Sequence, residues 1–416
     1  MAQVGDFQPE TESRGLLSRY HLLTLYLPAV ILALGHGIAT PALPVFTKSF
    51  GISFGVASLV IVVHTLGSLL STVPTGFLLD RLGRRRILLF GPMLTGISSF
   101  LMATVQSFPE LLFYRFIGGW AEQMWRQSRL AVIADTVNER RRGRQMTGMV
   151  GMESAGRLLG PAVGGLLAGR NIRVPFVVHG ILSLAAILPS FWMVQESVPV
   201  SPQRQPSKAD GPARAASGFW REILKFPYLA FFTAQFFASL ARGSLWGGTL
   251  LLYVAYAYHA GPELLGGLST VTGIIGIPIT FSSGYMMDRF GRKTTIVPGF
   301  ALTAAGLVFM ALTAQWRLTL TAFIVAYVWV QGAQSLTSGN MQVLGADLAP
   351  ASSRGKFFGV WRMIGEVGHL LSPAIFALLA EKIAYSLSFF FLAFCSFAAA
   401  AVVGLRVRET VGRGRI

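Results

Sequence analysis

Twelve apolar runs of about 20 residues follow one another along the chain, and they restrict its fold more than any other feature. They cover roughly 20–44, 53–79, 87–107, 110–134, 144–169, 174–194, 228–258, 263–287, 294–314, 318–345, 357–380 and 383–404. A run of about 18 apolar residues can cross a bilayer as a helix. Only 13% of the residues are charged, against about 25% in a soluble domain. We therefore predict an all-α membrane protein with twelve transmembrane helices, here called spans 1–12.

Basic residues are distributed unequally between alternate loops. The net charge of +17 could suggest a nucleic-acid partner. If the amino terminus is cytoplasmic, however, the cytoplasmic tails and loops hold 24 Lys and Arg residues and the outer loops hold five. This is the positive-inside bias. We predict a multi-pass protein of the cell membrane with both termini in the cytoplasm and no nucleic-acid partner.

One long polar stretch, residues 195–217, divides the spans into two groups of six. It is rich in Pro, Ser and Ala, as flexible linkers are. The segment that follows it, SGFWREILKF (217–226), has the pattern of a short amphipathic helix at a membrane surface. We expect the following divisions: an N-tail (1–19), a six-helix bundle (20–194), the linker with its helix (195–227), a second six-helix bundle (228–405) and a basic C-tail (406–416).

The two halves repeat a charged phrase. GFLLDRLGRRR at 76–86 returns as GYMMDRFGRK at 284–293, which aligns Asp80 with Asp288 at an offset of 208 residues. Ala134-Asp135 likewise aligns with Ala346-Asp347, and Pro161 aligns with Pro373, at an offset of 212. Two six-span halves in parallel repeat are typical of transporters, whose substrate binds near the bilayer midplane between the halves.

These motifs resemble the major facilitator superfamily over essentially the full length. The repeated phrase matches its loop G-x-L-x-D-R-x-G-R-R/K after spans 2 and 8, and RFIGGWAE (115–122) is similar to its span-4 motif. The resemblance implies two pseudo-symmetric six-helix bundles. The span-5 motif GRLLGPAVGG is typical of members that exchange drugs for protons, although its small residues can also serve close helix packing alone. Those residues are Gly156, Gly160, Pro161, Gly164 and Gly165.

We expect the repeated loops to form a latch between the halves. Asp80 can sit at the start of span 11, and Asp288 at the start of span 5, where a helix dipole favours a carboxylate. The glycines allow close approach, and the arginines can pair with acids, bind headgroups or only fix topology. The resemblance implies that such loops hold the halves together when the outer gate is open. The latch residues are Gly76, Asp80, Arg81, Gly83, Arg84, Arg85, Asp135, Gly284, Asp288, Arg289, Gly291, Arg292 and Asp347.

Charged residues inside the spans are functional candidates, because each costs at least about 2.5 kcal/mol at mid-bilayer unless it is paired or hydrated. Counting from the cytoplasmic ends places Glu122 level with Arg157, and Arg126 level with Glu153. If spans 4 and 5 face each other, these four residues form a compact neutral cluster. It is either a structural ion-pair network or a site where substrate or proton competes for one member. Our candidates for proton coupling or substrate binding are Glu122, Arg126, Glu153, Arg157, Arg242, Glu366, His369 and His36.

Aromatic and amide residues on spans 4, 7 and 10 are the expected cavity walls, which suit an amphipathic or aromatic solute. With the basic residue of the span-4 motif, they are Arg115, Trp120, Gln123, Trp125, Trp246, Tyr253, Trp329, Gln331, Gln334 and Asn340. Each of them can instead face lipid.

We predict a secondary active transporter, a proton-coupled exporter of amphipathic or aromatic compounds that works by alternating access. Six arginines against three glutamates within the spans leave organic anions or lipid-like solutes as an alternative. A membrane sensor that transports nothing is an alternative from another class. The sequence has no phosphate-binding G-x-x-x-x-G-K-[ST] motif and no zinc-type histidine pair. We predict no enzyme, no cofactor, no metal, and a monomer whose partners are a small molecule, protons and the lipid bilayer.

Overall fold

The computed structural model describes residues 25–136, 139–193, 226–246, 248–350 and 353–410, and helices make up most of this part. The first bundle contains α2 (Leu27–Ala39), α3 (Ala42–Lys48), α4 (Phe54–Leu82), α5 (Arg84–Thr104), α6 (Phe108–Thr136), α7 (Glu139–Arg170), α8 (Val174–Ala185) and α9 (Ile187–Met193). The second contains α11 (Phe226–Trp246), α12 (Thr249–Ala257), α13 (Pro262–Phe290), α14 (Lys293–Gln315), α15 (Leu320–Leu336), α16 (Asn340–Leu348), α17 (Arg354–Lys382) and α18 (Tyr385–Arg406).

These helices make the twelve predicted crossings. Four crossings are interrupted, and their two pieces are α2 with α3, α8 with α9, α11 with α12, and α15 with α16. Eight crossings within the described residues are long and apolar enough to span a membrane by length and composition. The other four are the charged helices α6 and α7 and the interrupted pairs α11–α12 and α15–α16. The fold is the predicted all-α, twelve-helix membrane fold.

Glycines with positive φ end helices at equivalent places in the two halves. Gly83 (φ 86°) separates α4 from α5, and Gly291 (φ 104°) separates α13 from α14. This backbone region is unfavourable for residues with a Cβ atom. The glycine of each repeated loop therefore allows a tight turn between two long helices.

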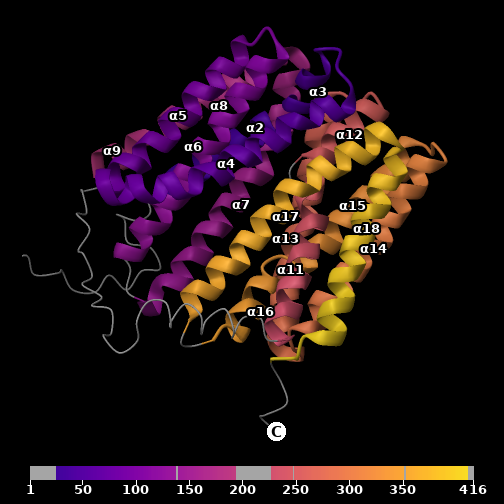
Figure 1. Cartoon of the computed structure of the whole chain (residues 1–416). Helices are drawn as coiled ribbons and strands as arrows, with labels where there is room; N and C mark the ends of the chain where they lie inside the picture. Colours follow the sequence, from indigo (N-terminus) through magenta and orange to yellow (C-terminus); the bar gives the residue numbers. More distant parts are fainter. Residues whose placement is uncertain (1–24, 137–138, 194–225, 247, 351–352, 411–416) are drawn as a thin grey trace, which may run out of the picture.

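The two bundles meet at one end and separate toward the other (Figure 1). We call the end with α3 and α12 the far end, and the end with the repeated loops 76–86 and 284–293 the latch end. Between the bundles, α4 packs against α17 and α7 packs against α13. The expected linker 195–227, its amphipathic helix and both tails lie largely outside the described residues, so the domain boundaries stay predictions.

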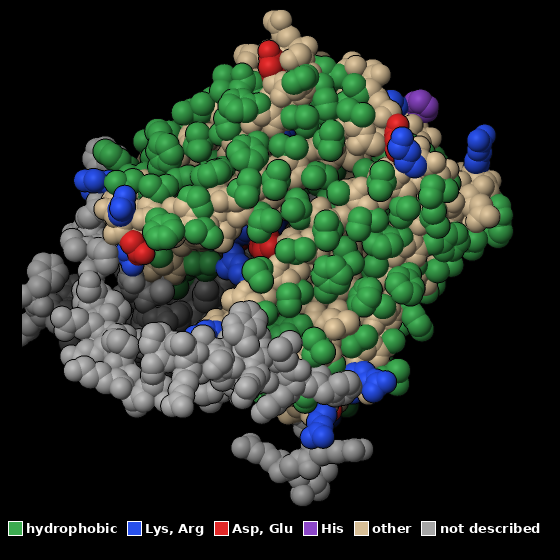
Figure 2. Space-filling view, in the orientation of Figure 1, with side chains coloured by type: hydrophobic (Ala, Val, Ile, Leu, Met, Phe, Trp, Pro, Cys, Tyr) green, Lys and Arg blue, Asp and Glu red, His purple; other side chains and the backbone are tan. Residues whose placement is uncertain are grey.

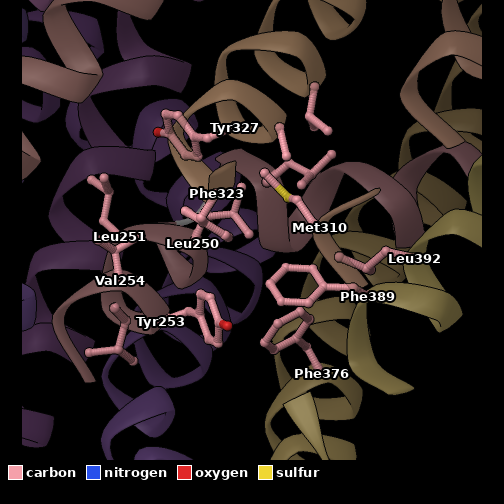
Figure 3. Close-up of a cluster of buried hydrophobic side chains, with 14 of the residues drawn as sticks. Leu250, Leu251, Tyr253, Val254, Met310, Phe323, Tyr327, Phe376, Phe389 and Leu392 are labelled. Carbon is pink, nitrogen blue, oxygen red and sulfur yellow. The ribbon is translucent and has the colours of Figure 1, made fainter. Parts of the chain in front are cut away.

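A hydrophobic cluster near the far end joins the bundles. Most of its members come from the second bundle, among them Tyr253, Phe323 and Phe389 (Figure 3). Phe54 of α4 belongs to the same cluster and is 3% exposed. Because lipid is as apolar as these side chains, close packing holds such a cluster together within a bilayer. The outer face of both bundles is mainly hydrophobic, as Figure 2 shows, and suits contact with lipid.

The small residues of α7 lie at close helix contacts. A Cβ atom on Gly156 would be 2.7 Å from Val30 O, and one on Gly160 would be 2.7 Å from Gly37 Cα, both on α2. A Cβ atom on Gly165 would be 2.7 Å from Pro262 O on α13. The motif thus lets α7 pack closely within its own bundle and across to the other. Its association with export stays a prediction.

Candidate functional site

A cavity of about 340 Å³ lies within the first bundle and reaches α11 and α12. Acidic and basic side chains also gather at the hollow between the bundles on the face seen in Figure 2, which is otherwise hydrophobic. Two predicted aromatic wall residues, Trp125 and Trp246, line the cavity. Its ionisable lining residues are Arg115, Arg126, Arg129, Arg157, Glu122, Glu153, His36, His64 and His179.

Glu153 on α7 is held between two arginines. Arg129 of α6 donates a hydrogen bond to its Oε1, and Arg157 Nη2 lies 3.8 Å from its Oε2. The Arg129 side chain is 8% exposed and lies over the Trp125 ring, whereas the Arg157 side chain is 59% exposed. Arg129 is therefore the main partner that compensates the buried Glu153 carboxylate, as a charge inside a membrane requires.

Arg126 connects the two bundles. Its Nε donates to Gln123 Oε1 over 2.8 Å, and its Nη2 lies 3.8 Å from Glu366 Oε1 on α17. Arg362 Nε is 3.9 Å from the same Glu366 oxygen. The predicted residues Arg126 and Glu366 thus form an ion pair between the bundles at the depth of the cavity.

Glu122 faces the cavity beside a histidine that our sequence analysis did not name. His64 Nε2 on α4 lies 3.4 Å from Glu122 Oε2, and the Glu122 side chain is 43% exposed. Two further histidines line the cavity, His36 and His179, with ring centroids 6.3 Å apart. In the sequence, His64 and His179 each stand as a lone polar residue within an apolar run. This pattern does not show whether the side chain faces a cavity, a neighbouring helix or lipid.

The predicted equal depth of Arg126 and Glu153 does not produce a pair, because Arg129 binds Glu153 instead. Glu122 lies against His64, and Arg157 forms its ion pair with Glu153. The helix α6 packs mainly on α4 and α5, while α7 packs on α2 and α13. Residue counting gives depth along a helix but not direction around it, so the four charges share a cavity without forming the expected cluster.

Arg242 supports the break between α15 and α16 and is not among the cavity-lining residues. Its guanidinium donates to Thr337 O over 2.5 Å and to Gln334 Oε1 over 3.2 Å. The chain turns there through Gly339, at a φ of 77°. A broken helix within a membrane leaves backbone carbonyls that need donors, and Arg242 supplies one. Asn340 is also structural, since its Nδ2 donates to Ser283 Oγ and Thr295 Oγ1, both over 2.9 Å.

Several predicted wall residues are not part of the cavity lining. Tyr253 is 2% exposed and lies within the hydrophobic cluster near the far end (Figure 3). Trp329 Nε1 donates to Leu302 O over 3.1 Å, and Gln331 donates to the Tyr327 hydroxyl over 3.4 Å. Gln123 and Gln334 are buried and accept from arginines, and Trp120 packs in the cluster of Leu79 and Met124. The predicted coupling residue His369 is also not among the cavity-lining residues and lies on α17, three residues after Glu366.

Contacts between the bundles close the far end. The Glu381 carboxylate, at the end of α17, accepts a hydrogen bond from Gly55 N at the start of α4, over 2.9 Å. A second contact crosses between the bundles: Lys48 Nζ of α3 donates a hydrogen bond to Ala255 O, near the end of α12, over 2.7 Å. An acid at a helix start and a base at a helix end both complement the helix dipole. The Phe54 ring of α4 adds contacts across the bundles with the rings of Tyr256, Phe376 and Tyr385.

The latch end differs from the prediction in the first bundle. The Asp80 side chain is 76% exposed and lies 3.7 Å from Arg84 Nη1, not at the start of α17. A Cβ atom on Gly76 or Gly284 would meet nothing within 4 Å, so neither glycine makes the expected close contact. The reason is that the bundles are apart at this end. The side chain of Asp135 lies outside the described part.

In the second bundle, the latch residues bind one another. Arg292 Nη1 lies 2.7 Å from Asp288 Oδ1, and its Nε lies 2.9 Å from Asp347 Oδ2. Burial lowers the pKa of Arg292, but its hydrogen bonds to Asp347 and Asp288 outweigh burial and raise the pKa overall. The other latch arginines bind locally: Arg85 donates to Phe191 O over 2.8 Å, and Arg289 donates to the Tyr285 hydroxyl over 2.6 Å. Arg81 is exposed.

Two helical bundles around a charged cavity, closed at one end, define the architecture of a membrane transporter. The chain belongs to the Major Facilitator Superfamily, whose sequence profile matches residues 25–241 and again 231–415. The double match agrees with the internal repeat. It confirms the predicted family.

Two bacterial relatives are similar in sequence. The chain is 28% identical to the Quinolone resistance protein NorA of Staphylococcus aureus over 175 residues, which are 42% of this chain and 45% of that protein. The match therefore spans about half the length of NorA. The chain is 22% identical to Multidrug resistance protein 2 of Bacillus subtilis over 353 residues, which are 84% of this chain and 86% of that protein.

Solved structures share the fold. A crystal structure of a D-xylose-proton symporter superimposes with a TM-score of 0.75 at 18% identity, and covers 95% of this chain and 100% of its own. An inward-open xylose transporter XylE from E. coli gives a TM-score of 0.73 at 17% identity, and covers 95% of this chain and 98% of its own. At this identity the likeness concerns the fold alone.

Proposed function

We propose that this protein is a proton-coupled exporter of amphipathic or aromatic organic compounds. It works as a monomer in the cell membrane by alternating access, with the latch end and both termini in the cytoplasm. The names of the two relatives, which concern drug resistance, support export. The excess of basic residues in alternate loops supports the orientation.

The observation that carries this proposal is the placement of Glu122 and Glu366. Glu122 faces a cavity that is closed at the far end, and Glu366 forms an ion pair with Arg126 across the bundles. Exchange requires a group that binds either a proton or the substrate, and a carboxylate within the membrane is such a group. Protonation of Glu366 would weaken the pair and leave Arg126 less compensated, so it would change how firmly the bundles hold together.

The membrane potential supplies sufficient energy. One elementary charge that moves across 100 mV releases about 2.3 kcal/mol, and a factor of ten in concentration corresponds to about 1.4 kcal/mol. Exchange of one or two protons for each substrate would therefore support accumulation against a gradient.

The test uses purified protein in proteoliposomes with an imposed pH gradient and a pH-sensitive dye inside. Addition of a lipophilic cation, such as tetraphenylphosphonium, or of a neutral aromatic compound should trigger proton movement. We expect Glu122→Gln or Glu366→Gln to abolish this coupling, while the matched variant Glu263→Gln, at the far-end start of α13, retains it. If both glutamate variants keep full coupling, these carboxylates do not carry the proton.

Exchange of organic anions is the second candidate. It is favoured by the four arginines and two glutamates among the cavity-lining residues. In the same proteoliposomes, anion exchange that does not depend on the pH gradient would support this candidate and contradict the first. Specific binding without transport of any compound would instead indicate a sensor.

A further inference from the structure

The cavity has an excess of positive charge. Four arginines and two glutamates are among its lining residues, and Glu366, outside that lining, pairs with Arg126. One positive charge more than the negative ones then remains when the histidines are set aside. An uncompensated charge within a membrane is unfavourable. A ligand that carries an anionic group therefore fits this cavity better than a ligand that is only cationic.

Arg157 is the arginine best placed to bind that anionic group. Arg126 is bound to Gln123 and Glu366, and the buried Arg129 is bound to Glu153. Arg115 is only partly exposed, and its Nε donates to Val60 O over 3.4 Å. Arg157 is 59% exposed, and its carboxylate partner in the described part is Glu153, at 3.8 Å. Because Arg129 holds Glu153 more closely, Arg157 can turn to a ligand without leaving that buried acid unpaired, which would be unfavourable.

Glu122 provides the opposite charge in the same cavity. Its side chain is 43% exposed, and its contact with His64 Nε2 is 3.4 Å long. Arg157 and Glu122 both line this cavity, so the two groups can face one ligand. Trp246 is 61% exposed, lines the cavity, and offers an aromatic surface to the rest of such a ligand.

We propose that Arg157 and Glu122 together form a binding site for zwitterionic amphipathic compounds. The guanidinium binds a carboxylate of the substrate in charge-assisted hydrogen bonds, and Glu122 binds its ammonium group. This inference rests on the proposed export function and specifies the substrate class of the same site. A proton on Glu122 removes the partner of the amine but not that of the carboxylate, so the site suits exchange of substrate for protons.

Three fluorescent probes with one aromatic group separate the two charges. Nα-dansyl-lysine is zwitterionic, its methyl ester is cationic, and its Nε-acetyl derivative is anionic. Binding of each probe is measured by fluorescence titration to the full-length protein in nanodiscs. The variants are Arg157→Gln, Arg157→Lys and Glu122→Gln, with Arg170→Gln as the matched control on the same helix, at an exposed position that is not among the cavity-lining residues.

The unmodified protein should prefer the zwitterion to the methyl ester by about ten- to a hundredfold, the range expected for hydrogen bonds between charged groups. Arg157→Gln should reduce that preference to about one, because it removes the carboxylate's partner while ester binding remains. Arg157→Lys should keep part of the preference, and Arg170→Gln all of it. Glu122→Gln should remove the preference for the zwitterion over the anionic derivative.

Equal binding of the zwitterion and its ester to the unmodified protein would overturn the inference. So would a preference that survives Arg157→Gln. If Arg157→Gln does not fold, a partial preference in Arg157→Lys, with weaker zwitterion binding and unchanged ester binding, still supports the site. Unchanged zwitterion binding in Arg157→Lys contradicts a bidentate contact. Failure of all three probes, while lipophilic cations still move protons in proteoliposomes, rejects the zwitterion site and leaves the export function intact.

Discussion

Removal of the Glu381 carboxylate should make the far end open more often. This side chain accepts a hydrogen bond from Gly55 N at the start of α4, across the two bundles. A Cβ atom at Gly55 would be 2.9 Å from the Glu381 Oε2 atom, so the carboxylate and the helix start are in direct contact. Opening of the far end breaks this contact, and it therefore stabilises the closed state only.

The size of the effect follows from helix capping. A side-chain cap at a helix start contributes about 0.5–2 kcal/mol, and a factor of ten in an equilibrium corresponds to about 1.4 kcal/mol. Glu381→Ala should therefore increase the ratio of open to closed far ends by about 2- to 30-fold. Glu381→Gln keeps a hydrogen-bond acceptor but loses the negative charge, which contributes about 0.3–1 kcal/mol beside a helix dipole. The expected increase in the ratio of open to closed far ends is then about 2- to 5-fold.

The chain is convenient for an accessibility assay, because Cys395 is its one cysteine and is buried. Cys395→Ser provides a background without cysteine, and Thr47→Cys places a thiol at a position that is 0% exposed and lines the cavity below the far end. The rate of labelling by a membrane-impermeant maleimide, added to intact cells, then reports the open fraction.

The matched control is Lys382→Ala, which removes an exposed charge from the neighbouring position. Labelling should be faster in both Glu381 variants and unchanged in the control. Equal rates in all variants would refute the role of this cap in closing the far end. Equal acceleration by the control would show that surface charge, and not the hydrogen bond, controls access.

Three further substitutions test packing and pairing, each by thermal unfolding of the purified protein. Gly160→Leu should destabilise the fold by about 1–3 kcal/mol through overpacking, whereas Gly151→Leu should be nearly neutral, because its Cβ atom would meet nothing within 4 Å. Arg242→Leu should cost about 1–3 kcal/mol, since it leaves buried acceptors unpaired at the helix break; an unchanged melting temperature would contradict its supporting role. Arg126→Gln should destabilise by about 1–3 kcal/mol, and the additional change Glu366→Gln should restore part of this loss because no unpaired charge remains. Strictly additive losses would mean that the two residues do not interact.

The twelve crossings were predictable because a bilayer leaves the backbone few choices. Each lipid-facing segment must satisfy its own hydrogen bonds as a helix, and the apolar runs show where such segments begin and end. The positions of the breaks were not predictable in the same way. Gly248 and Gly339 interrupt α11–α12 and α15–α16 with positive φ, but the chain has 46 glycines, and most of them lie within helices or contacts.

The cavity was predictable in part, for a geometric reason. Charges within apolar runs indicated Glu122, Glu153 and Arg157, since a bilayer makes such residues costly without a purpose. The sequence could not show that Arg129 would pair with Glu153 or that His64 would lie beside Glu122, because these contacts depend on the rotation of each helix about its axis. The aromatic and amide residues of span 10 are also ambiguous, because core packing and cavity lining require the same residue types.

Proton-driven movement of a substrate tests the central claim most directly. Inside-out membrane vesicles that contain the protein are given an acidic interior, and uptake of the zwitterion Nα-dansyl-lysine and of radiolabelled tetraphenylphosphonium is followed over time. We predict accumulation above the level that the membrane potential alone supports, its loss when a proton ionophore removes the pH gradient, and its absence in Glu122→Gln. Uptake of both compounds that stays at the passive level, with or without the gradient, would contradict proton-coupled export.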